Sequence, residues 1–175
     1  MDIKTIFGLP AHALLVHIPI VLIPLAAIGA LGLWWEPWRR RFGWATAVIL
    51  MVAGIFTQLA IGSGQTLKQQ LDTTALLRAH AQIAEDLRPF LLLFFIALVV
   101  FLYSERRQQA TGPVSMKHPI LITSFVATLL FAGVSIYWVQ RIGHTGAKAV
   151  WQPKMSHETR ENTTGTQESG TENGG

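Results

Sequence analysis

Residues 13–35 read ALLVHIPIVLIPLAAIGALGLWW, a run with a single histidine and no charged residue. A helix crosses the hydrocarbon core of a bilayer with about 20 such residues. Three further uncharged apolar runs follow, at residues 44–62, 89–103 and 119–140. Of the 175 residues in the chain, 50% are hydrophobic and 14% are charged. Because soluble domains carry about 25% charged residues, the sequence predicts an integral membrane protein.

The third run needs additional residues to cross a membrane. At about 1.5 Å per residue, residues 89–103 fall short of a core about 30 Å thick, so we expect this helix to begin near Ala75 to His80. Residues 1–151 then form an all-α fold, an integral membrane four-helix bundle. Its expected helices lie at about residues 13–35, 44–62, 78–103 and 118–142.

The end of the chain has a different composition. Residues 152–175 are rich in Thr, Glu, Gly, Asn and Ser and lack apolar periodicity. Such a segment buries too little apolar surface to offset the entropy that is lost on ordering. We therefore expect a disordered polar C-terminal tail.

Basic residues predict the orientation of the bundle. Arg39, Arg40 and Arg41 fill a very short expected loop between the first two helices, whereas Lys4 near the N-terminus is offset by Asp2. Basic residues concentrate on the cytoplasmic side of membrane proteins. We expect both termini on the outer side of a multi-pass protein in the bacterial inner (cytoplasmic) membrane.

Tryptophans and small residues fit this arrangement. Tryptophan is typical of membrane interfaces, and small residues permit close contact between helices. The tryptophans at the expected inner boundary are Trp34, Trp35, Trp38 and Trp44. The small residues are Ala26, Ala27, Gly29, Ala30 and Gly32 in the first helix and Ala53 and Gly54 in the second. We expect the first two helices to pack closely at these positions.

Four of the six histidines are expected at one end of the bundle. His12, His17, His80 and His144 lie about 27 to 39 Å from the inner ends of their helices, at about 1.5 Å per residue. The other two lie at the inner start of the fourth helix and in the tail. The four positions belong to three different helices and converge on the outer membrane face.

Histidines in such a position have two interpretations. Imidazole binds haem iron, copper and zinc, and ionisable residues at membrane depth usually face the bundle interior. A histidine at a membrane surface is also often only solvated or hydrogen-bonded. His17 lies about two turns inside an apolar run, where an unpaired polar side chain is costly. We take His12, His17, His80 and His144 as candidate cofactor or metal ligands.

The fourth helix carries a second pattern. Gly133, Tyr137, Arg141 and His144 recur at spacings that place them on one face. A glycine below a histidine lets a flat macrocycle approach the helix, and Arg141 is suited to pair with a haem propionate. The alternative is a helix-packing glycine beside an arginine whose head group reaches the interface. Gln58 in the second helix is deep enough to hydrogen-bond a ligand imidazole, or else it joins two helices.

Several function classes are excluded by motif. The chain has no cysteine, which excludes disulfides, cysteine-based metal sites and covalent c-type haem attachment. No P-loop, His-Glu-x-x-His zinc motif or nucleophile elbow is present. The basic residues lie at helix ends rather than in a stripe interleaved with aromatics, which argues against nucleic-acid binding. An electron carrier or redox subunit is therefore favoured over a stand-alone enzyme.

The start of the first helix resembles a known family. Residues 9–20 read LPAHALLVHIPI, similar to the opening signature of the bacterial membrane family of domain of unknown function 2231. That signature usually has His-Pro followed by Val-His-Phe-Pro, and here Ala13 and Ile18 replace the proline and the phenylalanine. His80 and the segment Gly143 to Ala147 also match. The resemblance covers roughly residues 7–151 and implies a four-helix membrane protein with a repeated histidine pattern, but no activity.

Three functions remain open. The first is a b-type cytochrome, with one or two non-covalent haems held by pairs of the four histidines. It would pass single electrons to or from a quinol or a periplasmic carrier. The second is a copper or zinc site made from three or four of the same imidazoles. The third is an accessory or structural subunit of a larger membrane complex, such as a respiratory complex.

Overall fold

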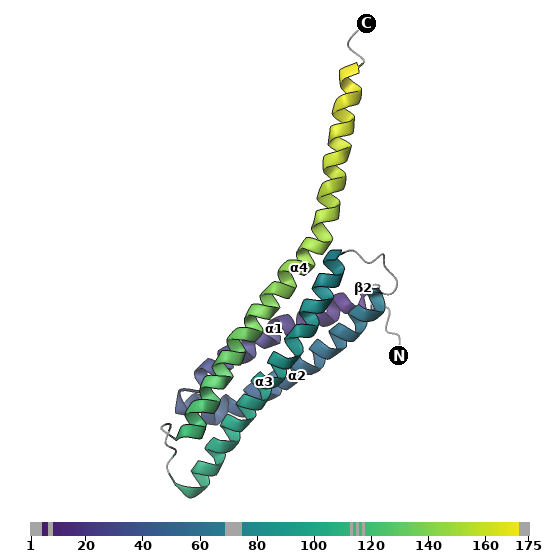
Figure 1. Ribbon diagram of the computed structural model, residues 1–175. Helices are drawn as coiled ribbons and strands as arrows, with labels where there is room; N and C mark the ends of the chain where they lie inside the picture. The colour runs from purple at the N-terminus through teal and green to yellow at the C-terminus, as the bar shows by residue number, and fades with distance from the viewer. Residues whose placement is uncertain are drawn as a thin grey trace.

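The computed structural model of the protein consists almost entirely of four helices. They are α1 (Ala11–Gly32), α2 (Glu36–Lys68), α3 (Ala75–Thr111) and α4 (Pro119–Thr171), shown in Figure 1. A two-residue strand, β1 (Thr5–Ile6), pairs antiparallel with β2 (Leu9–Pro10) ahead of α1. The structure describes residues 5–6, 9–68, 75–112, 114, 116 and 118–171, with side chains described at 15–64, 78, 80–110, 112, 114, 116 and 118–148.

All four helices are long and apolar enough to span a membrane. The spans are Leu15–Gly32, Glu36–Gly64, His80–Ala110 and Pro119–Lys148. The expected all-α, multi-pass membrane bundle is confirmed. α3 begins at Ala75, at the start of the expected interval from Ala75 to His80. The helix needs these upstream residues because residues 89–103 alone are too short to cross the bilayer.

The turn between α1 and α2 is shorter than the sequence suggests. Backbone bonds from Leu33 N to Ala30 O and from Trp35 N to Gly32 O close it, and α2 then starts at Glu36 and Pro37. Proline at the first helical turn and a carboxylate near the helix N-terminus are both favourable. The three arginines at 39–41 therefore lie in the first turns of α2. Our expectation of an arginine loop was wrong because the apolar run at 44–62 marks the membrane span and not the start of the helix.

The expected disordered tail is also corrected in part. α4 continues as a helix to Thr171 and projects away from the bundle (Figure 1). Propagating an existing helix costs much less than nucleating a new one, so the membrane span can extend a helix into a segment with little apolar surface. Residues 172–175 and the side chains beyond residue 148 lie outside the described part of the chain.

Neighbouring helices run antiparallel, and α4 returns to pack on α1. The α3–α4 contact extends along the whole span, from His80 beside Thr145 at one end to Phe101 beside Phe125 toward the other. Between them, the rings of Phe90 and Trp138 stack with centroids 6.0 Å apart. α1 inclines across the bundle (Figure 1).

Small residues bring α1 and α2 together, as expected. Ala26 and Ala30 of α1 and Ala53 of α2 are fully buried. A Cβ added to Gly29 would lie 2.7 Å from Thr46 Oγ1, and one added to Gly32 would lie 2.5 Å from Trp38 Nε1. Glycine is therefore required at both positions by the close approach of α2.

The core runs through the middle of the bundle and toward the end at which α2 begins, which we call the arginine end. Phe94, Phe101, Leu98, Leu50 and Ile23 are among its most deeply buried side chains. Large apolar residues also cover the outside of every helix, where a bilayer provides the apolar surroundings that they need. The outward-facing set includes Val21, Ile28, Leu31, Val48, Ile55, Leu92, Ile120 and Leu130.

Candidate functional site

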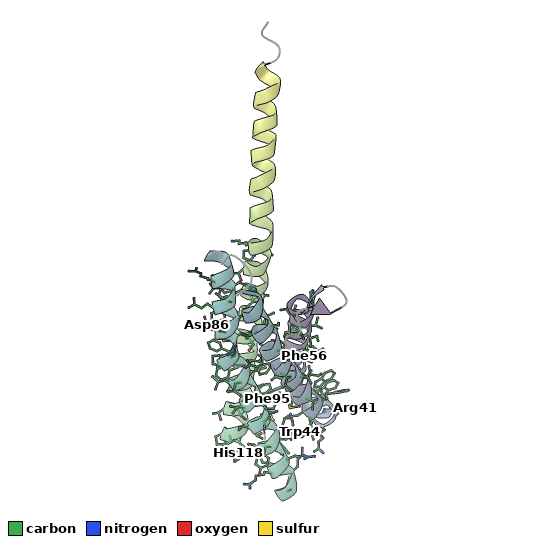
Figure 2. All side chains as sticks on the ribbon, turned by 90° about the vertical axis from the view of Figure 1, so that its right-hand side faces the viewer. Arg41, Trp44, Phe56, Asp86, Phe95 and His118 are labelled. Atoms are coloured by element: carbon green, nitrogen blue, oxygen red, sulfur yellow. The ribbon has the colours of Figure 1, made fainter. Side chains whose placement is uncertain are left out.

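The histidine positions gather at one end of the bundle. The first turns of α1 and α3 and the part of α4 around residue 144 lie at the end from which the C-terminal helix projects (Figure 1). Figure 2 shows Asp86 toward this end, and Arg41, Trp44 and His118 toward the other. Depth along the helices therefore agrees with the expectation drawn from residue spacing.

His80 has the most defined surroundings of the four. Its Nδ1 lies 3.3 Å from Oγ1 of Thr145 on α4. The Thr145 hydroxyl also lies 2.9 Å from the carbonyl oxygen of Arg141 and 3.0 Å from that of Ile142. Because a carbonyl can only accept, the hydroxyl donates its proton to the backbone and accepts from the imidazole. In the neutral ring, Nδ1 then carries the proton and Nε2 carries the lone pair.

Gly146 makes room for this ring. A Cβ at position 146 would lie 3.1 Å from His80 Cε1 and 3.4 Å from His80 Nδ1. Any larger residue at position 146 would therefore push the imidazole away from α4 and stretch its bond to Thr145. The helix surface and the hydroxyl together hold the imidazole against α4, with Nδ1 toward Thr145.

The other three histidines either are exposed or have side chains outside the described residues. His17 on α1 and His144 on α4 are exposed on the surface of the bundle, while the His12 side chain lies outside the described residues. Among the residues that the structure describes, no group of three or more His, Cys, Asp or Glu side chains is placed to hold one metal ion. The described part of the chain thus presents imidazoles at a common end without assembling a closed metal cage.

Packing loosens around these histidines. In α3 every residue from His80 to Asp86 is at least partly exposed, and in α4 the same holds from Ile136 to Lys148. The fully packed core begins at Leu87 in α3 and ends at Ser135 in α4. The histidine end is therefore the less tightly packed end of the α3–α4 pair.

The expected face of α4 is present, but it points outward. Gly133, Tyr137, Arg141 and His144 are all exposed, and nothing lies within 4 Å of a Cβ built on Gly133. The Arg141 guanidinium lies 5.9 Å from the Tyr137 ring centroid and 5.4 Å from that of Trp138. Gln58 of α2 is likewise exposed. A cofactor held by Gly133 and Arg141 would lie on the outside of α4, away from the core.

A family model described as "predicted membrane protein (DUF2231)" matches residues 8–159. The chain belongs to the DUF2231 family. Comparisons with curated proteins and with solved structures find no match. The family description and the four apolar helices agree on a multi-pass membrane protein, and the resemblance that starts at Leu9 is confirmed.

This DUF2231 chain also contains a buried polar cluster that the sequence analysis missed. Arg39 Nε donates to Glu105 Oε1 at 2.6 Å, and the two side chains are 3% and 5% exposed. Arg39 Nη1 donates to the carbonyl oxygen of Leu33 at 2.9 Å, and Gln109 donates to the same Glu105 oxygen at 3.0 Å. The cluster joins the end of α1, the start of α2 and the end of α3.

A sequence signal for this cluster exists in retrospect. Glu36 and Glu105 are the only acidic residues in the segments 33–48 and 99–124, which make up the arginine end. Each of them binds an arginine, since Glu36 pairs with Arg40 at 2.8 Å. A lone carboxylate among arginines beside a membrane span is therefore a sign of an ion pair.

Proposed function

We propose that the protein is a membrane-bound electron carrier of the b-type cytochrome kind, with haem held at the histidine end of the bundle. The observation that supports the proposal most directly is the setting of His80. A metal-binding histidine usually donates its other ring N–H to an oxygen that fixes the tautomer and orientation of the ring. The bond from His80 Nδ1 to Thr145 Oγ1 is of this kind, and in our proposal Nε2 is the nitrogen that binds iron.

Haem is favoured over a bare metal ion by the number of ligands that it requires. A porphyrin supplies four nitrogens, so two imidazoles complete the coordination of the iron, whereas structural zinc takes four protein ligands. The described residues offer no group of three or more metal-binding side chains. In this proposal His80 is one axial ligand, and the second comes from His12, His17 or His144.

The surroundings of His80 suit a flat, largely apolar cofactor. Partly exposed residues of α3 and α4 flank the ring, so little packing must be disrupted to admit a macrocycle. Arg141, exposed and held against two aromatic rings, would pair with a propionate that reaches the outward face of α4. Gly133, two turns before Arg141 on the same face of α4, serves the same macrocycle only if the haem lies on that outward face.

When bound with two imidazole ligands, haem supplies one-electron transfer and leaves no position for oxygen. We propose a quinol or a soluble carrier as the electron partner, alone or within a respiratory complex. The positive charge at the opposite end favours an orientation with both termini and the histidine end outside the bacterial inner membrane.

The decisive test is the absorption spectrum of the full chain. Protein purified in mild detergent from haem-sufficient cells should show the α-band of a b-type haem after dithionite reduction. His80→Ala should abolish or shift this band. His118→Ala, an exposed histidine at the opposite end, is the matched control and should leave the spectrum unchanged.

Two other results would replace the proposal. Stoichiometric copper or zinc without iron would indicate a metal-binding protein. Normal expression of His17→Ala and His80→Ala variants that have lost no bound group would indicate an accessory subunit instead.

A further inference from the structure

A surface rich in arginine and aromatic residues lies at the end opposite the histidines. We define the Arg-Trp surface as Arg41 and Trp44 of α2 with Tyr103 and Arg106 of α3, all of which are exposed. The Arg106 guanidinium lies 5.5 Å from the Trp44 ring centroid, which links the two helices. Arg41 precedes Trp44 by three residues and is therefore its neighbour on the helix surface.

The carboxylates at this end of the bundle do not neutralise the arginines of the Arg-Trp surface. The segments 33–48 and 99–124 carry six basic residues, Arg39, Arg40, Arg41, Arg106, Arg107 and Lys117, against two acidic ones. Both carboxylates are already engaged, Glu105 by the buried Arg39 and Glu36 by Arg40. The positive charge of Arg41 and Arg106 is thus not cancelled by the carboxylates of this end.

Stacking prepares these guanidinium groups to bind an anion. Arg106 lies over Trp44, and Arg41 lies 5.6 Å from the ring centroid of Phe42. An aromatic neighbour restricts the guanidinium while leaving its N–H groups able to donate at the edge. Guanidinium binds phosphate oxygens in a bidentate manner. A phosphate at this surface would therefore meet donors that are already oriented.

The surface continues into the membrane as apolar stripes. On the face of α2 that carries Arg41, the exposed residues include Trp44, Val48, Met51 and Ile55, spaced three to four apart. On α3, Tyr103, Val100 and Ile96 form the matching exposed stripe. From Arg41 to Ile55 the rise is about 21 Å, which exceeds half of a hydrocarbon core about 30 Å thick. From Arg106 to Ile96 on α3 the rise is about 15 Å, about half of that core, so each stripe, counted from its arginine, can lie along an acyl chain in one leaflet.

We propose that this surface binds an anionic phospholipid, with the phosphate on Arg106 and Arg41 and the acyl chains along the stripes of α2 and α3. A soluble polyanion would use the arginines but leave the apolar stripes unused. A phospholipid matches both halves of the surface. The proposal is independent of haem binding at the other end.

The test measures lipid that remains bound to the full chain. Protein reconstituted in phosphatidylcholine vesicles with a minor fraction of phosphatidylglycerol is released into mild detergent, and retained lipids are counted by native mass spectrometry. Wild type should retain phosphatidylglycerol in preference to phosphatidylcholine. Arg106→Gln and Arg41→Gln should each reduce this preference about ten-fold or more, the effect of losing a hydrogen bond to a charged phosphate.

Arg40→Gln is the matched control. Arg40 is also exposed and its loss changes the net charge equally, but it is engaged with Glu36 at 2.8 Å, so this variant should keep most of the preference. Trp44→Ala should weaken the preference without any change in charge, whereas Trp44→Phe should preserve it.

Three outcomes would overturn the proposal. Equal losses in Arg106→Gln, Arg41→Gln and Arg40→Gln would mean that only a diffuse positive field acts. Equal retention of phosphatidylcholine would mean that the head-group charge is not recognised. Displacement of phosphatidylglycerol by free phosphate at matched ionic strength would identify a soluble anion as the ligand.

Discussion

Replacing Glu105 with alanine should leave a buried arginine charge without its counter-ion. Arg39 is 4% exposed and its Nε bonds to Glu105 at 2.6 Å. Removing one partner of a buried ion pair costs about 3–5 kcal/mol, because the remaining charge is uncompensated. Arg39 still donates to the carbonyl oxygens of Leu33 and Trp34, at 2.9 and 3.4 Å, so we expect the lower end of this range.

A loss of about 3 kcal/mol lowers the folding equilibrium constant about a hundred-fold. It can be measured by titrating the detergent-solubilised protein with SDS in mixed micelles and following tryptophan fluorescence. Glu36→Ala is the control. Its pair with Arg40 is an exposed i, i+4 contact with side chains 57% and 56% exposed, which is worth about 0.3–0.5 kcal/mol.

A double variant separates the ion pair from the space that it fills. Arg39→Met with Glu105→Met removes both charges and retains much of the volume, and such replacements are often neutral or stabilising. The double variant should therefore be more stable than Glu105→Ala. Equal stability of Glu105→Ala and Glu36→Ala, or a double variant less stable than the sum of its single changes, would refute the assignment of a buried pair.

Four further substitutions test the packing and the histidine end. Gly32→Ala should lower the free energy of unfolding by about 1–3 kcal/mol, because the added methyl group overpacks against the Trp38 indole. Gly143→Ala is the control: nothing lies within 4 Å of its added Cβ, so the change should be neutral or stabilise by up to about 1 kcal/mol. SDS titration measures both variants. Phe101→Ala empties a fully buried site and should cost about 3–5 kcal/mol. Thr145→Val removes the hydroxyl that accepts from the His80 imidazole and should weaken haem binding about 10–100-fold in a haem titration. Unchanged haem affinity would contradict the assignment of His80 as an axial ligand.

The spans were predictable because hydropathy and length act locally. Each apolar run has to satisfy its backbone hydrogen bonds within its own helix, so the existence of the four helices follows from composition alone. The upstream start of α3 followed from the bilayer thickness. The early start of α2 did not, because the rule for membrane spans says nothing about how far a helix continues into the polar region.

The depth of the candidate site along the helices was predictable from the sequence, but the direction in which its side chains face was not. Spacing along a helix fixes how far His144 and Gly133 lie from the membrane centre and whether they share a face. It does not fix the rotation of that face about the helix axis, which depends on packing by the other helices. In the structure this face of α4 points outward. The pair of Arg39 with Glu105 was missed for a related reason, since its members are 66 residues apart in the chain.

The two ends of the bundle are held by different means, and this makes the proposals separable. At the arginine end, a buried ion pair and the bond from Trp38 Nε1 to Gly29 O, at 3.3 Å, fix the first three helices to one another. At the histidine end, the deep core of α3 and α4 stops at Leu87 and Ser135. Changes at the first end should therefore lower the free energy of unfolding while cofactor affinity is retained in the folded fraction. Changes around His80 should lower cofactor affinity and leave the free energy of unfolding nearly unchanged, because little core packing depends on that ring.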